Sequence, residues 1–353
     1  MFSLNEYKYE LPESAIAQVP ADQRDQSRLL FLARDSGNIS HHRFSDLCGL
    51  LSPDDVLVIN DTKVIPGRLL GKKATGGKVE VLLLRRIDAD ETGIPPGSIL
   101  YQCLVRASKG PKPGAHLFFD QGLKGEIVTV GEGVSTIRFV FDGDFDSLLD
   151  QIGNVPLPPY IRRQEGHNKG DDRTAYQTVY ASQKGAIAAP TAGLHFTEAL
   201  LDAIRAKPVK IVAITLHVGY GTFLPVRSLD IRDHKIHTEA YHISKESAET
   251  INAAKADGRR IVVVGTTCVR TLEYASDSRG RVVSGSGECD LFIYPGYRFN
   301  IVDALITNFH LPQSTLLMLV AAFAGRERVL HAYGEAIDRT YRFYSYGDAM
   351  LIA

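Results

Sequence analysis

The sequence predicts an α/β protein: a three-layer α/β domain with a largely parallel sheet, interrupted by an inserted small β-barrel. Two observations lead to this prediction. Over most of the chain, short apolar runs alternate with helical stretches, a pattern typical of layered α/β domains. Between residues 66 and 155 the chain instead carries Gly-rich, β-like runs with no helical pattern. We therefore expect residues 1–65 and 156–353 to form one discontinuous domain and residues 66–155 to form the barrel.

The expected barrel strands are β-like runs separated by turn signals such as Gly76-Gly77 and Pro113-Gly114. The runs are Lys78–Leu84, Leu100–Arg106, His116–Phe119, Gly125–Val130 and Ser135–Phe141. The Pro-rich segment Pro156–Tyr160 is expected to be the linker that leaves the barrel, because proline resists both a helix and a central strand.

In the α/β domain, buried strands are expected at short apolar runs. These are Val56–Ile59, Ala186–Ala189, Val209–Leu216, Arg260–Val264 and Ala304–Ile306. Helices are expected over Thr197–Ala206, with Thr197 as N-cap, and over Lys245–Asp257, between Ser244 and Gly258. Apolar residues from Val329 to Tyr341 are spaced for one face of a third helix.

Composition excludes several classes of protein. The longest apolar stretch, Leu316–Ala324, has nine residues, too few to cross about 30 Å of hydrocarbon. The N-terminus lacks the basic and apolar segments of a secretory signal. The four cysteines lie far apart and form no Cys-x-x-Cys pair, which argues against a disulfide framework and a thiolate metal site. We expect a cytoplasmic protein that does not bind a membrane.

The charge balance argues against a protein that coats nucleic acid indiscriminately, since 40 Lys and Arg face 41 Asp and Glu. One run is locally basic. From Arg68 to Arg86 it contains six basic residues and one acid, Glu80. Two interpretations stay open for this run: a solvated surface or a patch that faces phosphates.

Polar residues follow each of the five strands expected in the α/β domain. The five segments are Asn60–Thr62, Pro190–Thr197, His217–Thr222, Gly265–Thr267 and Thr307–Pro312. Ligands of open α/β sheets bind outside the carboxyl ends of the strands. We therefore expect these segments to converge on one pocket.

Other chemistries find weaker support. The sequence contains no dinucleotide-binding, P-loop or nucleophile-elbow motif. His234, His237 and Glu239 are possible metal ligands, but they lack the i, i+4 spacing of the usual zinc pair. We predict no metal there, and instead a hydrogen-bonded His237–Glu239 pair suited to proton transfer. The aromatic segment Tyr341–Asp348 either stacks a base or packs in the core.

Taken together, these segments resemble one family, the S-adenosylmethionine:tRNA ribosyltransferase-isomerases of queuosine biosynthesis. The most specific matching strings are Ala189–Thr197, Thr215–Phe223, His237–Glu239, Arg270–Glu273, Thr307–Pro312 and Tyr341–Asp348. The resemblance covers essentially the whole chain, in order. It departs at Cys289, Ala107 and Ile236, where the family usually has Thr, Pro and Met, and these differences concern the scaffold.

The resemblance implies a reaction. The family transfers and isomerises the ribosyl part of S-adenosylmethionine onto 7-aminomethyl-7-deazaguanine (preQ1) at the wobble position of a tRNA, giving epoxyqueuosine-tRNA, adenine and methionine. It implies S-adenosylmethionine as co-substrate, no metal cofactor, and tRNA carrying preQ1 as partner. We expect a monomer.

This reaction needs a base at C5′, a proton for the departing adenine, and a target base lifted out of the anticodon stack. We hypothesise that His217, or the His237–Glu239 pair, is the C5′ base. His195 or His310 is the expected acid toward adenine. A tRNA-binding scaffold without activity and a metal-dependent hydrolase stay open as alternatives.

The expected substrate-binding residues come from the same strand ends and from the basic run. They are Asn60, Asp61, Arg68, Thr191, Gly193, Thr266, Thr267, Arg270, Thr307, Asn308, Tyr344 and Asp348. Among them, Asn308 or Asp61 is expected to read the edge of a purine, Arg68 to meet tRNA phosphates and Tyr344 to stack on a base.

Overall fold

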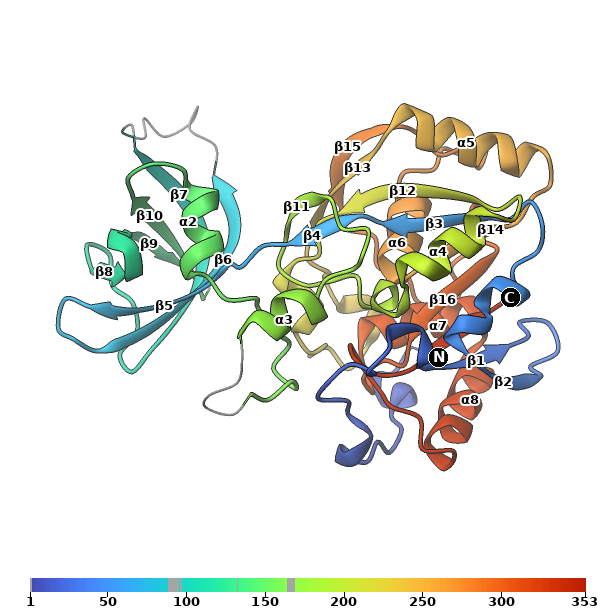
Figure 1. Ribbon diagram of the computed structural model, residues 1–353. Helices are drawn as coiled ribbons and strands as arrows, with labels where there is room; N and C mark the ends of the chain where they lie inside the picture. The colour runs from blue at the N-terminus through green and yellow to red at the C-terminus, as the bar shows by residue number, and fades with distance from the viewer. Residues whose placement is uncertain (1, 88–94, 96, 132, 164–168) are drawn as a thin grey trace.

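The computed structural model describes residues 2–87, 95, 97–131, 133–163 and 169–353. Within them the chain forms a large α/β part, which holds both termini, and a smaller β-barrel beside it (Figure 1). No helix of the described chain is long and apolar enough to cross a membrane.

The large part is built on a nine-stranded sheet in the order β15-β13-β12-β3-β14-β16-β17-β1-β2. Its strands are β1 (Arg28–Leu32), β2 (Ile39–Arg43), β3 (Val56–Asn60), β12 (Lys210–Leu216), β13 (Glu239–Ile243), β14 (Ile261–Val264), β15 (Gly285–Cys289), β16 (Ala304–Asn308) and β17 (Ala349–Ile352). The central strands β12, β3, β14 and β16 run parallel, and antiparallel pairs lie toward both edges. The predicted α/β fold class is confirmed.

Helices cover both faces of this sheet, so the fold has three layers (Figure 1). The helices are α1 (Leu47–Leu50), α4 (Glu198–Arg205), α5 (Lys245–Ala256), α6 (Thr266–Tyr274), α7 (Thr315–Ala324) and α8 (Arg326–Asp338). A further helix, α3 (Lys169–Ala175), lies on the side of the large part that is turned toward the barrel (Figure 1). Successive residues of β3 point to opposite faces: Val58 packs with α5 to α8, and Leu57 packs with α1 and α4.

The predicted N-caps are confirmed. The Thr197 side chain accepts a hydrogen bond from the Leu200 N–H at 3.1 Å and begins α4. The Ser244 side chain accepts from the Ser247 N–H at 3.0 Å and begins α5. These bonds satisfy amide groups that a helix start leaves without an intrahelical partner.

The barrel is closed and antiparallel, in the order β10-β7-β6-β5-β8-β9. Its strands are β5 (Arg68–Lys73), β6 (Lys78–Ile87), β7 (Ser98–Ala107), β8 (His116–Phe119), β9 (Lys124–Gly131) and β10 (Val134–Val140). The five predicted runs are confirmed. β5 was not predicted, because its Lys and Arg residues hide the alternation that buries Leu69.

Two expectations are corrected by the structure. The stretch between 66 and 155 does contain a helix, α2 (Phe145–Ile152), which packs Phe145, Leu148 and Leu149 into the barrel core. The strand expected at Ala186–Ala189 is β11 (Gln183–Ala186), and it pairs with β4 (Thr62–Val64) outside the large sheet. The backbone after it instead donates hydrogen bonds from Ile187 and Ala188 to the Val218 carbonyl.

The chain enters and leaves the barrel side by side. The Arg68 and Asn154 backbones exchange hydrogen bonds of 3.0 and 2.9 Å at this junction. The exact limits of two domains, at 65/66 and 155/156, stay a prediction.

Candidate functional site

A pocket of about 850 Å³ opens where β14 and β16 end, and we call it the uncharged pocket. Its described lining contains neither Asp, Glu, Lys nor Arg. The lining residues are Pro159, Tyr160, Tyr176, Ala188–Ala192, Val218, Thr222, Gly265–Thr267, Thr307–Leu311, Ser314, Leu316, Tyr344 and Ser345. The polarity of this lining suits a neutral group of a ligand.

Most of the predicted strand ends meet at this pocket. The segments that follow β11, β12, β14 and β16 all contribute to its lining. Of the predicted substrate-binding residues, it brings together Thr191, Thr266, Thr267, Thr307, Asn308 and Tyr344. The segment after β3 contributes no residue to the described lining of this pocket.

Asn60 and Asp61, which end β3, use their polar groups on the protein itself. Asn60 Oδ1 accepts from the Thr62 and Leu216 amides, and its Nδ2 donates to the Leu216 carbonyl and to Thr267 Oγ1. Asp61 accepts hydrogen bonds from Thr215 Oγ1 at 2.7 Å and Ser182 Oγ at 2.8 Å. In this structure both residues position the strand ends.

Asn308 lines the uncharged pocket, and its amide is held by the protein. Its Nδ2 donates to the Tyr344 carbonyl at 2.8 Å, which fixes the orientation of the amide. Its Oδ1 is buried, and the Asn308 side chain is a hydrogen-bond partner of the His195 ring. The buried hydroxyl of Tyr176 similarly interacts with Ser345. These polar groups therefore belong to the wall of the pocket.

His310 and His195 are both buried imidazoles held by a hydroxyl group. His310 Nε2 lies 2.7 Å from Thr307 Oγ1, and burial lowers the pKa of His310 to about 3. His195 Nδ1 lies 2.7 Å from Ser27 Oγ, and burial lowers its pKa to about 4. His310 lines the uncharged pocket, whereas His195 lines a separate small cavity. Both rings are neutral at pH 7, which favours hydrogen bonding over proton donation.

A second cavity of about 1150 Å³ adjoins the first, and Thr222 and Leu316 line both. We call it the charged pocket. Its charged and titratable lining residues are Arg227, Asp233, His234, Lys235, His237, Glu239 and Arg270. The two pockets together thus form one site with an uncharged and a charged half.

The expected hydrogen bond between the Glu239 and His237 side chains is absent from the described structure. Glu239 Oε2 instead contacts Arg270 Nη1, and Oε1 accepts from the Gly219 amide at 2.8 Å. Arg270 also donates to the Leu291 carbonyl at 2.9 Å. Both side chains are buried, so the Glu239–Arg270 pair is a fixed, self-compensated wall of the charged pocket.

The two histidines proposed as C5′ base lie in different places. The His237 ring is exposed to the charged pocket and packs on Gly221, where an added Cβ would lie 2.6 Å from the ring. His217 lines neither pocket. Its Nδ1 lies 2.7 Å from Thr62 Oγ1, and burial lowers its pKa.

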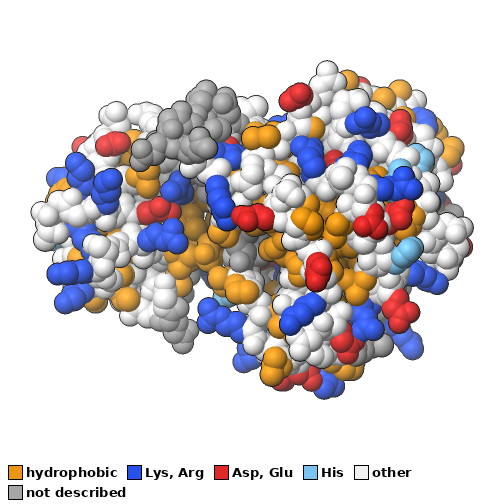
Figure 2. Space-filling view, turned by 90° about the horizontal axis from the view of Figure 1, so that it is seen from below, with side chains coloured by type: hydrophobic (Ala, Val, Ile, Leu, Met, Phe, Trp, Pro, Cys, Tyr) orange, Lys and Arg blue, Asp and Glu red, His pale blue; other side chains and the backbone are white. Residues whose placement is uncertain are grey.

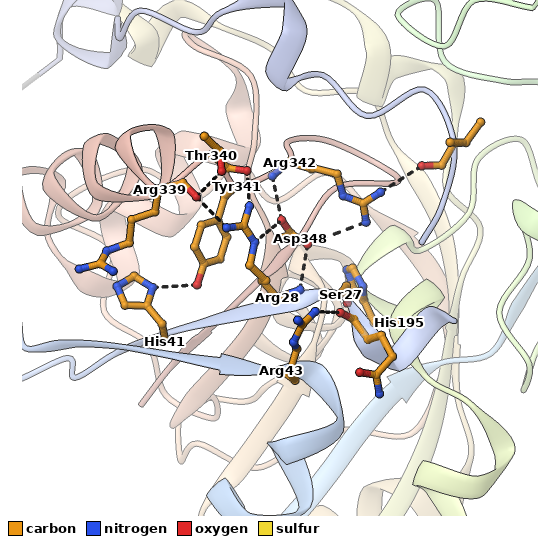
Figure 3. A network of polar contacts seen from close by, with 12 residues as sticks. Ser27, Arg28, His41, Arg43, His195, Arg339, Thr340, Tyr341, Arg342 and Asp348 are labelled. Atoms are coloured by element: carbon orange, nitrogen blue, oxygen red, sulfur yellow. Dashed lines mark hydrogen bonds and ion pairs between the residues drawn. The ribbon is translucent and has the colours of Figure 1, made fainter. Parts of the chain in front are cut away.

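Three further predicted residues have structural partners. A Cβ at Gly193 would lie 2.0 Å from the Tyr180 hydroxyl, so glycine is needed there for packing. Asp348 accepts from the Arg28 and Arg342 amides at 2.9 and 2.8 Å (Figure 3). Arg68 lies on the barrel, in a bidentate ion pair with Glu80.

The C-terminal aromatic segment is largely core. Tyr341, Phe343, Tyr344 and Tyr346 are all buried. Tyr344 also lines the uncharged pocket, and its ring centroid lies 4.7 Å from that of Tyr160. Sequence reasoning missed Tyr160, Tyr176 and Arg227 as lining residues, since each lies outside the strand-end segments.

The possible metal ligands do not gather. In the part of the chain that the structure describes, no group of three or more His, Cys, Asp or Glu side chains is placed to hold a metal ion.

The buried neutral histidines predict a pH dependence of stability. Because the unfolded chain binds protons near pH 6.5 and folded His195 only near pH 4, the free energy of unfolding falls as the pH drops from 6.5 toward 4, by up to about 1.4 kcal/mol per unit. We expect His195→Gln to reduce this slope in urea unfolding measured at pH 7, 6 and 5. Exposed His116→Gln is the control. An unchanged slope in His195→Gln would contradict the assignment.

Comparison with known proteins identifies the family. Residues 4–352 match the family described as "Queuosine biosynthesis protein". The S-adenosylmethionine:tRNA ribosyltransferase-isomerases of Syntrophotalea carbinolica and Geotalea uraniireducens are each 52% identical over 350 residues, covering 99% of both chains. The crystal structure of S-adenosylmethionine tRNA ribosyltransferase from Thermotoga maritima is 37% identical, covers 99% of this chain and 100% of its own, and superposes with a TM-score of 0.54. The chain therefore belongs to the queuosine biosynthesis protein family.

Proposed function

We propose that this protein transfers and isomerises the ribosyl group of S-adenosylmethionine onto preQ1 at the wobble position of a tRNA. The products are epoxyqueuosine-tRNA, adenine and methionine. The observation that carries the proposal is the two-part site at the strand ends, in which an uncharged and a charged pocket adjoin. The relatives named S-adenosylmethionine:tRNA ribosyltransferase-isomerase support it along the whole chain. We expect the reaction to take place in the cytoplasm and the protein to act as a monomer.

The uncharged pocket suits the adenosine end of S-adenosylmethionine. Adenine is neutral, and the described lining of this pocket carries no charged side chain. Thr266 and Thr267 begin α6 and add hydroxyl and amide groups at the same pocket. Tyr344, whose ring packs against Tyr160, adds an aromatic edge to the pocket, against which adenine can pack.

Of the two candidate bases, the geometry favours His237. It is exposed to the charged pocket and lies against Gly221, next to Thr222, which lines both pockets. A base at this place reaches the atoms of a substrate that spans the two pockets. His217 is turned toward Thr62 and lines neither pocket.

The tRNA contact is expected on the barrel, at a row of directly opposed residues. Lys72 on β5 pairs in register with Lys78 on β6 and with Phe118 on β8, and Phe118 pairs with Lys124 on β9. All four are exposed, and none of the three lysines has an ion pair in the described structure. Opposed like charges destabilise a sheet, so an anionic partner would relieve them. Lys and Arg side chains spread over the barrel end in Figure 2.

This row revises which part of the basic run meets phosphates. Arg68 is paired with Glu80, and Arg85 with Glu288. Their charges are therefore partly compensated inside the protein. The lysines of the row keep theirs, and the exposed Phe118 between them offers a surface for an unpaired base.

The first test is product analysis. The purified protein is incubated with S-adenosylmethionine, EDTA and tRNA bearing preQ1, and free adenine and methionine are measured by chromatography. We expect both, and only when that tRNA is present. S-adenosylhomocysteine would indicate methyl transfer instead. Activity lost to EDTA would favour the hydrolase, and binding of tRNA without product would favour the scaffold.

Substitution of the proposed base tests its role. We expect His237→Gln to lower kcat by roughly 100- to 10,000-fold, the usual contribution of a general base, while tRNA binding is retained. His217→Gln is the matched variant and is expected to lose less. The opposite order of the two losses would transfer the role to His217.

The barrel row is tested by salt dependence. We expect Lys72→Ala with Lys124→Ala to raise KM for tRNA and to reduce the slope of log K against log salt by about 1 to 2, because each lysine neutralises one phosphate. KM for S-adenosylmethionine is expected to stay unchanged. Lys245→Ala on α5 serves as control. A double variant that binds tRNA like the wild type would remove the row from the interface.

A further inference from the structure

The two pockets differ in charge, and S-adenosylmethionine differs in charge between its two ends. Its adenosine end is neutral, whereas its other end carries a sulfonium, an ammonium and a carboxylate. A charge moved out of water needs a counter-charge or hydrogen bonds in its new surroundings. The described lining of the uncharged pocket offers no counter-charge, and that of the charged pocket offers both signs.

We propose that the charged pocket binds the amino-acid end of S-adenosylmethionine, with Arg227 on the α-carboxylate and Asp233 on the α-ammonium. This inference rests on the proposed function, because it takes S-adenosylmethionine as the ribosyl donor. It adds a binding site and two specificity residues that lie outside the predicted strand-end segments.

Arg227 is the cation of this pocket that is free to bind an anion. Arg270 is committed to Glu239 and to two backbone carbonyls. Arg227 is exposed, and no hydrogen bond or ion pair engages its side chain within the described residues. A guanidinium group matches a carboxylate with two parallel hydrogen bonds. Lys235 lines the same pocket and adds a second positive charge.

A second observation at the same place points to a ligand. Ser228, next to Arg227 in the chain, lines the charged pocket, and its hydroxyl is buried without a hydrogen-bond partner in the described structure. Buried polar groups are normally satisfied. A bound carboxylate at Arg227 offers an acceptor for this hydroxyl.

Binding of S-adenosylmethionine across the two pockets also places its sulfonium and C5′. With adenosine in one pocket and the amino acid in the other, the sulfonium and C5′ between them lie at the junction lined by Thr222 and Leu316. His237 lies beside this junction, against Gly221. The same placement therefore brings C5′ to the proposed base.

Decarboxylated S-adenosylmethionine tests the site, because it lacks only the carboxylate. With tRNA saturating and adenine release as readout, we expect wild-type kcat/KM to be roughly 10- to 100-fold higher for S-adenosylmethionine than for the decarboxylated analogue. Arg227→Ala is expected to lose most of this ratio by losing activity on S-adenosylmethionine alone. Arg227→Lys is expected to restore part of it.

Arg279→Ala, at an exposed turn, is the matched control and is expected to keep the wild-type ratio. An unchanged ratio in Arg227→Ala would overturn the proposal. If that variant instead raises KM for tRNA at an unchanged ratio, Arg227 binds an RNA phosphate. Melting temperatures of the variants identify any loss that comes from misfolding.

Failure of the proposed function can be told apart from failure of this inference. If wild-type protein releases no adenine, calorimetric titration with S-adenosylmethionine and with its decarboxylated analogue still measures the site. Tighter binding of S-adenosylmethionine by the wild type, and equal binding of both by Arg227→Ala, supports the charged pocket. Equal binding of both compounds by the wild type contradicts it.

Discussion

The site depends on the buried amide of Asn60. At the end of β3 this one side chain accepts hydrogen bonds from two backbone amides and donates to the Leu216 carbonyl and to Thr267 Oγ1. It therefore ties together β3, the end of β12 and the start of α6 at the point where strand pairing stops. Backbone groups there lack ladder partners and need others. The segment after β12 and the start of α6, which contribute to the lining of the uncharged pocket, begin from this fixed point.

Burial keeps the two histidines behind the strand ends, His195 and His310, in the neutral form. His195 and His310 are buried, each against a hydroxyl group, and burial lowers their pKa to about 4 and about 3. As neutral rings they orient hydrogen bonds without adding charge to the uncharged pocket. The charged pocket contains a buried carboxylate, Glu239, and the charge of this carboxylate is compensated by Arg270. His237, exposed at the charged pocket, is the base that we propose for proton transfer.

The barrel shows that a run of basic residues along the chain does not by itself predict a continuous basic surface. Along the chain, Arg68 to Arg86 looks like one patch. In the structure Arg68 and Arg85 are paired with acids, and Lys73 donates to the Lys109 carbonyl. Two other lysines of the run, Lys72 and Lys78, join Lys124 from another strand. The row forms because the strands pair in one particular register. That register depends on how six strands close into a barrel, and no local sequence pattern predicts it. The sequence prediction also missed β5, whose basic residues hide its alternation, and α2, which packs into the barrel core.

The sequence by itself determined the central part of the fold: apolar runs became β3, β12, β14 and β16, Thr197 and Ser244 capped their helices, and the segments after most of the predicted strands met at one pocket. Such signals are local, since a cap or a buried run is defined within a few residues. The other strands of the large sheet, β1, β2, β13, β15 and β17, were not predicted. Only the tertiary structure decided which polar groups remain free. Asp61 and Asp348 are used by the protein, Glu239 contacts Arg270 rather than His237, and Arg227 lines the charged pocket without an ion pair in the described structure. The partner of a side chain is set by residues far away in sequence, because it depends on which segments folding brings together.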